Sequence, residues 1–459
     1  MSRPEDAIQL PHAPRLRFGA FEIDLQEREL RNRGIRLQIQ HKPFQVLELL
    51  LERRGALVTR AELAQRLWPN LHVSYDHGLN TAVNTLRQIL GDSIRTPRYI
   101  ETRPGLGYRF IAPVEEIPEG GTIGRLPRDR QRGGNMEAYQ DYLRGRFFLN
   151  RMNEADARKS LACFESAIGQ DGQCALAYAG LADAYCLLAV LGGLQQSDAY
   201  RRAGDFTLAA LRMDTDLPEA HAALGTVRQI FERDSAGAEA SYLKALRLDP
   251  VFAAGHRRYA ELLCAMGRFA EASEEIQRAV ELDPLSLPTN IELAWTRYVA
   301  RDFENAVQHS WRTLVLEPAF APAQTILGLA YEQMGMYDEA IIEFENARTC
   351  SESHPATIAA LAHATARAGK QSEAERHISE LDAMSQRRYV SHYWKAIAHL
   401  GLGAVETALN YLGEACDRHE VWLMWLDVEP RLEPVRGSAR FERIAASAGL
   451  RNRAYATGL

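Results

Sequence analysis

The chain is poor in cysteine and in long apolar runs. Its six cysteines, among 459 residues, form no CxxC pair and are expected to be reduced core residues, with a redox-sensing pair as the alternative. The longest apolar run, residues 185–194, is broken by glycine and is shorter than the ~20 residues that span a bilayer. Residues 1–14 lack the apolar segment of a secretory signal. We therefore expect a cytoplasmic protein without a membrane partner.

Catalytic patterns are also missing. The 13 histidines show no HExxH or similar metal spacing, and no serine or cysteine has a base close by in the sequence. Gly105 and Gly107 form a Gly-x-Gly, but no helix follows them, so the βαβ context of a nucleotide-binding loop is absent. We expect no enzyme, no metal and no cofactor, although a site assembled from residues distant in sequence stays open as an alternative.

The most informative segment that is present runs from residue 59 to residue 110. Thr59 is a suitable N-cap for a short amphipathic helix over 60–68, which Pro69 ends. Residues 76–90 place leucine or valine at i, i+4, i+7 and i+11, which predicts a second helix with one buried stripe. Residues 98–111 are two β-prone segments around a glycine-rich turn, as in a hairpin.

The second helix leaves hydrogen-bonding side chains outside its apolar stripe. Such amides and hydroxyls suit base edges in a major groove, whereas an ordinary solvated face holds Glu and Lys. The residues expected to read bases are Asn80, Thr81, Asn84, Thr85 and Gln88. Those expected on the DNA backbone or in the hairpin tip are Arg87, Thr102, Arg103 and Arg109.

Residues 15–113 resemble the winged-helix domain of OmpR/PhoB-type regulators over its whole length. Alternating apolar residues from Leu16 to Ile39 resemble its N-terminal antiparallel sheet, residues 42–50 its first helix, and residues 99–102 with 107–110 its wing. The resemblance implies double-stranded promoter DNA as a partner, RNA polymerase as a further candidate, and two copies on direct repeats. It puts recognition-helix contacts on Ala82, Asn84, Thr85 and Arg87 and a wing contact on Thr102.

The sequence departs from that pattern in the contact positions. Many response regulators have arginines at the positions of Asn84 and Thr85, and a wing arginine at that of Pro104. The target sequence therefore cannot be carried over. The alternative is a winged helix used only for protein contacts.

Charge is distributed unevenly along the chain. Residues 1–113 hold 17 Lys and Arg against 12 Asp and Glu, a net charge of +5, while the rest of the chain has a net charge of −11. A basic module attached to an acidic body favours phosphate binding at one end, since counterion release drives such binding.

A repeat of 34 residues occupies most of the C-terminal part. Alanine recurs at Ala238, Ala272, Ala306, Ala340, Ala374 and Ala408. Small residues mostly stand twelve positions earlier and seven later, as expected where two helices cross closely. Pro250, Pro284 and Pro318 share one register and would end the second helix of each unit.

This pattern resembles the tetratricopeptide repeat, most clearly at Leu327-Gly328 with Tyr331, Ala340 and Phe344. We expect about eight repeats over residues 136–421, closed by a C-terminal cap over 422–459. The resemblance implies a curved array that binds a protein, a peptide or another effector on its concave face. Candidate contacts there are Arg257, Arg258, Asn290 and Arg297.

The whole chain is thus expected to be a multidomain, mainly α protein, with an N-terminal α+β winged helix and an all-α solenoid. Residues 1–14 would be a mobile arm and 114–135 a linker rich in Pro, Gly and Arg. The domain order resembles CadC/ToxR-like one-component regulators, but the linker stands where those have a membrane span. Fewer than 20 residues precede the first strand, too few for a receiver domain. We expect a sequence-specific transcription regulator, with a scaffold or adaptor protein as the alternative.

Overall fold

The computed structural model of the chain describes residues 15–19, 21–32, 35–37, 39, 41–67, 76–90, 92, 97–103, 105–117, 135–351 and 354–449. The chain divides into two compact units, residues 1–132 and 133–459. The multidomain, mainly α architecture expected from the sequence is confirmed. In the described part of the chain, we find no helix with the length and apolarity needed to cross a membrane.

The N-terminal unit begins with an antiparallel sheet in the order β4-β3-β2-β1-β8. Its strands are β1 (Arg15–Phe18), β2 (Phe21–Asp24), β3 (Glu29–Asn32), β4 (Ile35–Leu37) and β8 (Glu115–Ile117). The expected linker start at residue 114 is wrong, because Arg15, Leu16 and Arg17 pair in register with residues 117, 116 and 115. The strand β8 is short and has no apolar alternation by which the sequence would predict it. It pairs with backbone groups at the edge of β1 that would otherwise have no strand beside them.

Three helices and a smaller sheet complete the described part of this unit. The helices α1 (His41–Glu52), α2 (Arg60–Leu67) and α3 (Asp76–Leu90) correspond to the expected ones. The strands β5 (Leu57–Thr59), β6 (Ile100–Arg103) and β7 (Gly107–Phe110) form an antiparallel sheet in the order β5-β7-β6. The expected hairpin is therefore β6-β7, with β5 added on its β7 side.

An aromatic cluster joins the two sheets. The ring of Phe18 on β1 contacts the rings of Phe21, Tyr99 and Phe110 at centroid distances of 5.6, 5.8 and 5.1 Å. Phe110 belongs to β7 and Tyr99 immediately precedes β6, so this cluster connects the hairpin to the N-terminal sheet. These four rings are buried in one core with the inner faces of α1, α2 and α3.

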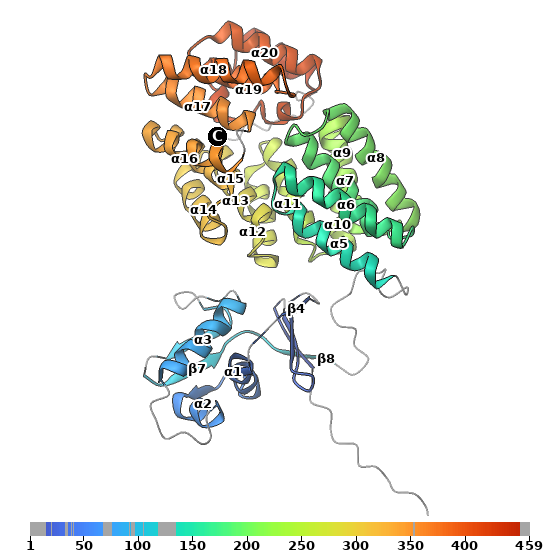
Figure 1. The fold of residues 1–459 in the computed structure, drawn as a ribbon, viewed down its shortest axis with the longest axis vertical. Helices are drawn as coiled ribbons and strands as arrows, with labels where there is room; N and C mark the ends of the chain where they lie inside the picture. Colours follow the sequence, from blue (N-terminus) through green and yellow to red (C-terminus); the bar gives the residue numbers. More distant parts are fainter. Residues whose placement is uncertain are drawn as a thin grey trace, which may run out of the picture. The chain divides into compact units, whose positions relative to one another are not determined.

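The C-terminal unit is a succession of helix pairs (Figure 1). Residues 135–351 and 354–417 hold sixteen helices, and each helix packs on the next one in the chain. They are α5 (Met136–Leu149), α6 (Glu154–Gln170), α7 (Ala175–Val190), α8 (Gln196–Met213), α9 (Pro218–Val227), α10 (Ser235–Leu248), α11 (Ala253–Ala265), α12 (Phe269–Leu282), α13 (Leu287–Val299), α14 (Phe303–Leu316), α15 (Ala321–Gln333), α16 (Tyr337–Cys350), α17 (Pro355–Arg367), α18 (Gln371–Ser385), α19 (His392–Gly401) and α20 (Val405–Asp417). The helix α9 continues into one π-helical turn, η1 (Arg228–Glu232).

The 34-residue repeat corresponds to buried crossing points between paired helices. All six alanines of the series from Ala238 to Ala408 have no exposed surface. At Gly328 on α15, an added Cβ would lie 2.6 Å from the ring of Phe344 on α16. Small residues recur because each pair brings its two backbones this close.

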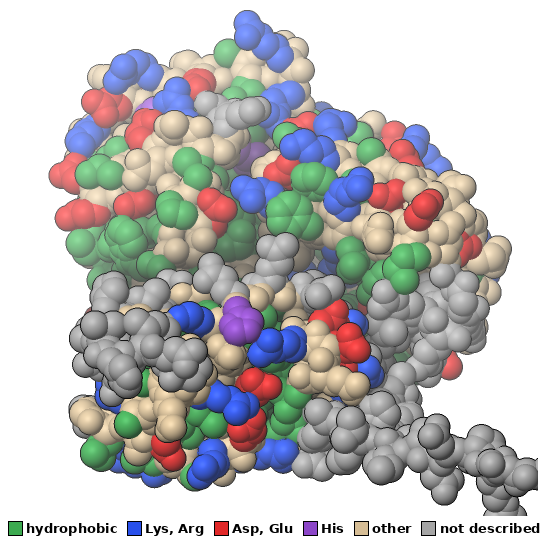
Figure 2. Space-filling view, turned by 60° about the horizontal axis from the view of Figure 1, so that its bottom comes forward, with side chains coloured by type: hydrophobic (Ala, Val, Ile, Leu, Met, Phe, Trp, Pro, Cys, Tyr) green, Lys and Arg blue, Asp and Glu red, His purple; other side chains and the backbone are tan. Residues whose placement is uncertain are grey.

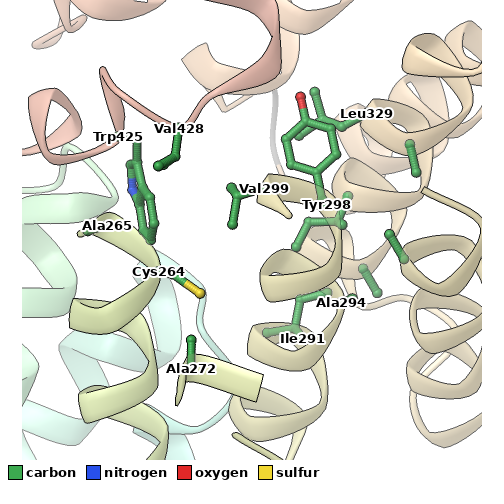
Figure 3. Close-up of a cluster of buried hydrophobic side chains, with 14 of the residues drawn as sticks. Cys264, Ala265, Ala272, Ile291, Ala294, Tyr298, Val299, Leu329, Trp425 and Val428 are labelled. Carbon is green, nitrogen blue, oxygen red and sulfur yellow. The ribbon is translucent and has the colours of Figure 1, made fainter. Parts of the chain in front are cut away.

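The chain after α20 folds back against the array. It forms the 3₁₀ helices η2 (Val421–Trp425) and η3 (Pro430–Leu432) and the helix α21 (Ala439–Ser447). Trp425 and Val428 join the main core of the array beside Cys264 on α11 and Val299 on α13 (Figure 3). The Tyr298 hydroxyl donates to Glu429 Oε1 at 2.7 Å. We call residues 421–435 the plug segment.

Early and late repeats of the array also touch one another. The ring Nε2 of His354 lies 3.2 Å from the carbonyl oxygen of Leu191. Arg388 pairs with Glu154 at 3.5 Å, and Arg151 pairs with Glu317 at 3.7 Å. The array therefore curves far enough for its first two pairs to contact residues more than 150 positions later in the sequence.

Candidate nucleic-acid interface

The helix α3 has the buried and exposed faces that the sequence predicts. Leu79, Val83, Leu86 and Leu90 are buried in the core of the N-terminal unit. On the other side, Asn80 and Asn84 are exposed and Thr85 is half-buried. The side chains of Thr81 and Gln88 lie outside the described residues. Ala82, a contact position by resemblance, is buried in the core, which corrects that expectation.

The Asn80 amide is held by two neighbouring elements. Its Oδ1 accepts hydrogen bonds from Arg60 Nη2 at 3.0 Å and from the Tyr108 hydroxyl at 3.2 Å. Arg60 Nη1 in turn donates to the Tyr108 hydroxyl at 3.1 Å. These contacts fix the exposed start of α3 relative to α2 and β7, so Asn80 positions the face as well as forming part of it.

Sequence reasoning did not single out Arg60, although a signal was present. Arg60 is the first residue of α2, directly after the N-cap Thr59. The cap is reciprocal: the Glu62 amide donates to Thr59 Oγ1 at 3.2 Å, and the Thr59 amide donates to Glu62 Oε2 at 2.7 Å. The Thr59 amide and, second, the Thr59 hydroxyl both donate to the Glu62 carboxylate and lower the pKa of Glu62. The capping box fixes the start of α2, where the side chain of Arg60 reaches Asn80 on α3.

Arg87 corrects the sequence expectation most clearly. It was expected outside and on phosphate, but it is 5% exposed. Its Nη2 donates to the carbonyl oxygen of Ile100 at 2.8 Å and to Thr102 Oγ1 at 2.7 Å. Burial lowers the pKa of Arg87, and the nearby Asp92 carboxylate opposes that effect. Arg87 therefore binds α3 to β6, and Thr102 is its acceptor.

Helix geometry explains this burial. Arg87 follows Val83 by four residues and thus lies at the edge of the buried stripe. Asp92 reinforces the junction, because its carboxylate accepts from the backbone amides of Arg98 at 2.7 Å and Ile100 at 2.8 Å. Arg87 and Asp92 therefore both hold the junction between α3 and the hairpin.

Two arginines of the hairpin remain at the surface. Arg103 Nη2 lies 3.2 Å and Arg109 Nη1 lies 3.6 Å from the Glu101 carboxylate. Exposed ion pairs contribute ~0–1 kcal/mol, so the exposed Arg103 can exchange Glu101 for another anion at little cost, whereas Arg109 is half-buried. The visible surface of the molecule mixes basic and acidic side chains (Figure 2). Phosphate binding would therefore depend on individual arginines such as these.

The candidate contacts in the array differ from expectation. Arg258 is buried, and its Nη2 lies 2.6 Å from Asp183, which also pairs with Arg146 at 2.7 Å. Asn290 Nδ2 donates to the carbonyl oxygens of Pro284 and Ser286, both at 2.9 Å. Arg258 and Asn290 therefore hold helices and a helix start in place.

Family models of known proteins match part of each unit. Residues 34–110 match the family described as transcriptional regulatory protein, C terminal, and residues 321–347 match the tetratricopeptide repeat. The N-terminal unit is an OmpR/PhoB-type winged helix, and the C-terminal unit is a tetratricopeptide-repeat array.

Individual relatives match the N-terminal part of the chain. The transcriptional regulatory protein KdpE of Mycobacterium tuberculosis is 30% identical over 99 residues, which are 22% of this chain and 44% of that protein. The cholera toxin homolog transcriptional activator of Vibrio parahaemolyticus is 31% identical over 106 residues, 23% of this chain and 36% of that protein. The chain thus spans less than half the length of these relatives. The crystal structure of the APC/C hetero-tetramer Cut9-Hcn1 aligns with 58% of this chain and 54% of its own at 18% identity and a TM-score of 0.42.

Proposed function

We propose that this chain is a sequence-specific DNA-binding transcription regulator of the one-component type, whose repeat array binds a protein or another effector. The observation that carries the proposal is the exposed polar face of α3 next to a hairpin with two surface arginines. Asn84 and Thr85 on this face are hydrogen-bonding groups, and the opposite face of α3 is buried. The match of residues 34–110 to transcriptional regulatory proteins supports it.

The proposed roles follow from the geometry. Asn84, Thr85 and Asn80, with Thr81 and Gln88 beside them in the helix, would read base edges in the major groove. Arg103 and Arg109 would contact phosphate, with the hairpin next to the minor groove. Arg87 and Thr102 would position α3 and the hairpin without touching DNA. Two copies would occupy direct repeats, with RNA polymerase as a further partner.

The test is selection of bound fragments from a random DNA pool by the full-length protein, followed by affinity measurements over a salt series. We expect paired direct half-sites about one helical turn apart and clear preference over random DNA. Binding that is equally strong on random DNA at every salt concentration would contradict the proposal and favour an adaptor protein.

Two matched variants then separate the roles. Asn84→Ala should lose preference at particular base pairs, by ~1–3 kcal/mol, with an unchanged salt slope. Arg103→Gln should weaken binding to all sequences and lower the slope by about one. Equal losses on selected and random DNA for Asn84→Ala would contradict its assignment to base reading.

A further inference from the structure

The repeat array holds a cavity of about 420 Å³ that is partly open to solvent. Its lining comes largely from the first helices of successive pairs, with Leu187 on α7, Trp295 on α13, Ile326 on α15 and Thr357 on α17, and from the plug segment with Trp425. Cavities of ~300–1,000 Å³ lined mainly by apolar side chains are typical of small-molecule sites. The size therefore suits a compact organic molecule.

Tryptophan side chains form much of the wall. The ring of Trp295 meets the ring of Trp425 edge to face at a centroid distance of 5.0 Å, and the rings of Trp394 and Trp422 lie 4.5 Å apart. All four residues line the cavity, and the whole chain has six tryptophans. Large rings that are already packed against one another offer flat apolar surfaces to an aromatic or cyclic ligand.

Two donors in the lining have no acceptor among the described residues. Arg431 is 3% exposed; its Nε and Nη2 both bind the Glu429 carboxylate at 3.0 Å, but its buried Nη1 has no hydrogen-bond partner. The buried Nε1 of Trp295 also has none. A buried donor without an acceptor is costly, so both atoms favour a ligand that brings oxygen acceptors.

Four glutamates line the cavity, and three of them pair with arginines: Glu154 with Arg388, Glu261 with Arg257, and Glu317 with Arg151. Glu292 lies three residues before Trp295 on α13, and its buried Oε1 has no hydrogen-bond partner in the described part of the chain. Burial raises the pKa of Glu292, Glu261 raises it further, and Arg257 opposes both. Burial therefore favours the neutral form of Glu292, whose carboxyl group can donate as well as accept a hydrogen bond.

The plug segment limits the kind of ligand that the cavity can hold. Trp425 and Val428 fill part of the space between α11 and α13 (Figure 3), and the Val421 amide donates to Gln196 Oε1 at 3.2 Å. Because the chain covers this part of its own concave face, what is left is a pocket with aromatic walls. A pocket of this kind favours a small molecule over an extended peptide.

We propose that the cavity of the array binds a small aromatic or apolar organic anion, whose ring contacts the tryptophan wall and whose anionic oxygens accept hydrogen bonds from Arg431 Nη1 and Trp295 Nε1. This inference deepens the effector-binding half of the proposed function and rests on it. Such a ligand would touch early repeats, late repeats and the plug segment at once. Binding would therefore stabilise the contacts between early repeats, late repeats and the plug segment.

The test uses anilinonaphthalene sulfonate, an aromatic anion whose fluorescence rises in apolar surroundings, with the full-length protein and no DNA. A neutral analogue, N-phenylnaphthylamine, measures the contribution of the sulfonate. We expect one saturable site per chain with preference for the anion. Trp295→Phe should weaken anion binding about tenfold, Arg431→Gln should abolish the preference over the neutral analogue, and Thr325→Trp should fill the cavity and abolish binding of both probes.

Matched controls lie outside the cavity. Trp311→Phe and Ile342→Trp change exposed side chains on α14 and α16, and Arg440→Gln changes a half-buried one on α21; all three should leave both affinities unchanged. Circular dichroism checks folding of every variant; if Arg431→Gln does not fold, Trp295→Phe and Thr325→Trp still decide. Binding that survives Thr325→Trp, or no saturable binding at all, would overturn the inference. Since no DNA is present, a failed DNA selection would leave this result standing and would refute only the regulator proposal.

Discussion

The two units of this chain differ in which side chains they expose and bury: the N-terminal unit exposes polar side chains on α3, and the array buries aromatic side chains of the plug segment. In the N-terminal unit, α3 buries one stripe and leaves Asn84 exposed on the opposite face. In the array, Trp425 and Val428 of the plug segment are buried in the core with α11 and α13. A ligand larger than the protein, such as duplex DNA, needs a convex exposed face. A small ligand suits a recessed cavity, so the two proposed sites differ in kind.

The units also differ in how their stability is distributed. The winged helix has one core, to which both sheets and three helices contribute. The array is built from pairs that pack on their neighbours, so its stability is close to a sum of local terms. The plug segment is one exception, since the Tyr298–Glu429 contact joins residues 131 positions apart, and the contacts between early and late repeats are another. Disruption of the plug segment should therefore affect several repeats at once.

The largest expected effect is at Trp425. Trp425→Ala should lower the unfolding free energy of the array by about 3–5 kcal/mol, because it leaves a cavity between α11 and α13. Hydrogen exchange during urea titration measures this in peptides from residues 253–432, while peptides from residues 41–110 should not change. Trp311→Ala, where the side chain is 48% exposed, should cost less than about 1 kcal/mol. Equal losses in the two variants would show that the plug segment does not stabilise the array.

The second comparison concerns two glycines of the hairpin in the N-terminal unit. A Cβ at Gly107 would lie 2.0 Å from the carbonyl oxygen of Val58, so Gly107→Ala must separate β7 from β5. We expect a loss of about 3 kcal/mol in the winged helix and none in the array. Gly105 has a φ of +74° and no atom near its Cβ position. Gly105→Ala should therefore cost only about 1 kcal/mol, from backbone strain. Exchange in peptides 41–110 distinguishes the two, and the reverse order would contradict the pairing of β5 with β7.

The third prediction separates residues that position α3 from residues proposed to contact DNA within the winged helix. Arg87→Met removes the two hydrogen bonds to Ile100 and Thr102 and should destabilise the winged helix by about 2 kcal/mol. DNA binding should weaken only as far as the unit unfolds, with an unchanged salt slope. Asn84→Ala should do the opposite, with full stability and altered sequence preference. A smaller salt slope for a fully folded Arg87→Met protein would show instead that Arg87 contacts a DNA phosphate.

Local patterns in the sequence predict much of this structure. The stripe from Leu79 to Leu90 predicts the orientation of α3, and the alanine series predicts the array, because the same crossing recurs every 34 residues. Both signals arise within a single helix or between neighbouring helices. Hydrophobic periodicity records such contacts directly.

The rest depends on contacts that periodicity cannot register. Arg87 is buried because Ile100 and Thr102, 13 and 15 residues later, accept its hydrogen bonds. The lining of the cavity brings together residues as far apart in the sequence as Glu154 and Arg388. A single sequence gives no measure of such long-range approach, and for this reason Arg431 and Trp295 were missed as candidate ligand contacts.

The smallest expected effect tests the contact between early and late repeats. Burial, with help from Arg388, lowers the pKa of His354 from the ordinary 6.5 to about 4, while the Leu191 carbonyl and Glu154 oppose the shift. The folded state thus holds the ring neutral, so its contribution to stability is present above pH 6.5 and is lost as pH falls toward 4. His354→Gln keeps a donor for the Leu191 carbonyl but cannot titrate. The stability of the parent relative to this variant should therefore fall by about 1 kcal/mol between pH 7.5 and about pH 5.8. Hydrogen exchange in array peptides measures this, with the winged-helix peptides as internal control. A difference that stays constant across this range would mean that His354 is solvated, and that α17 does not contact the end of α7 in solution.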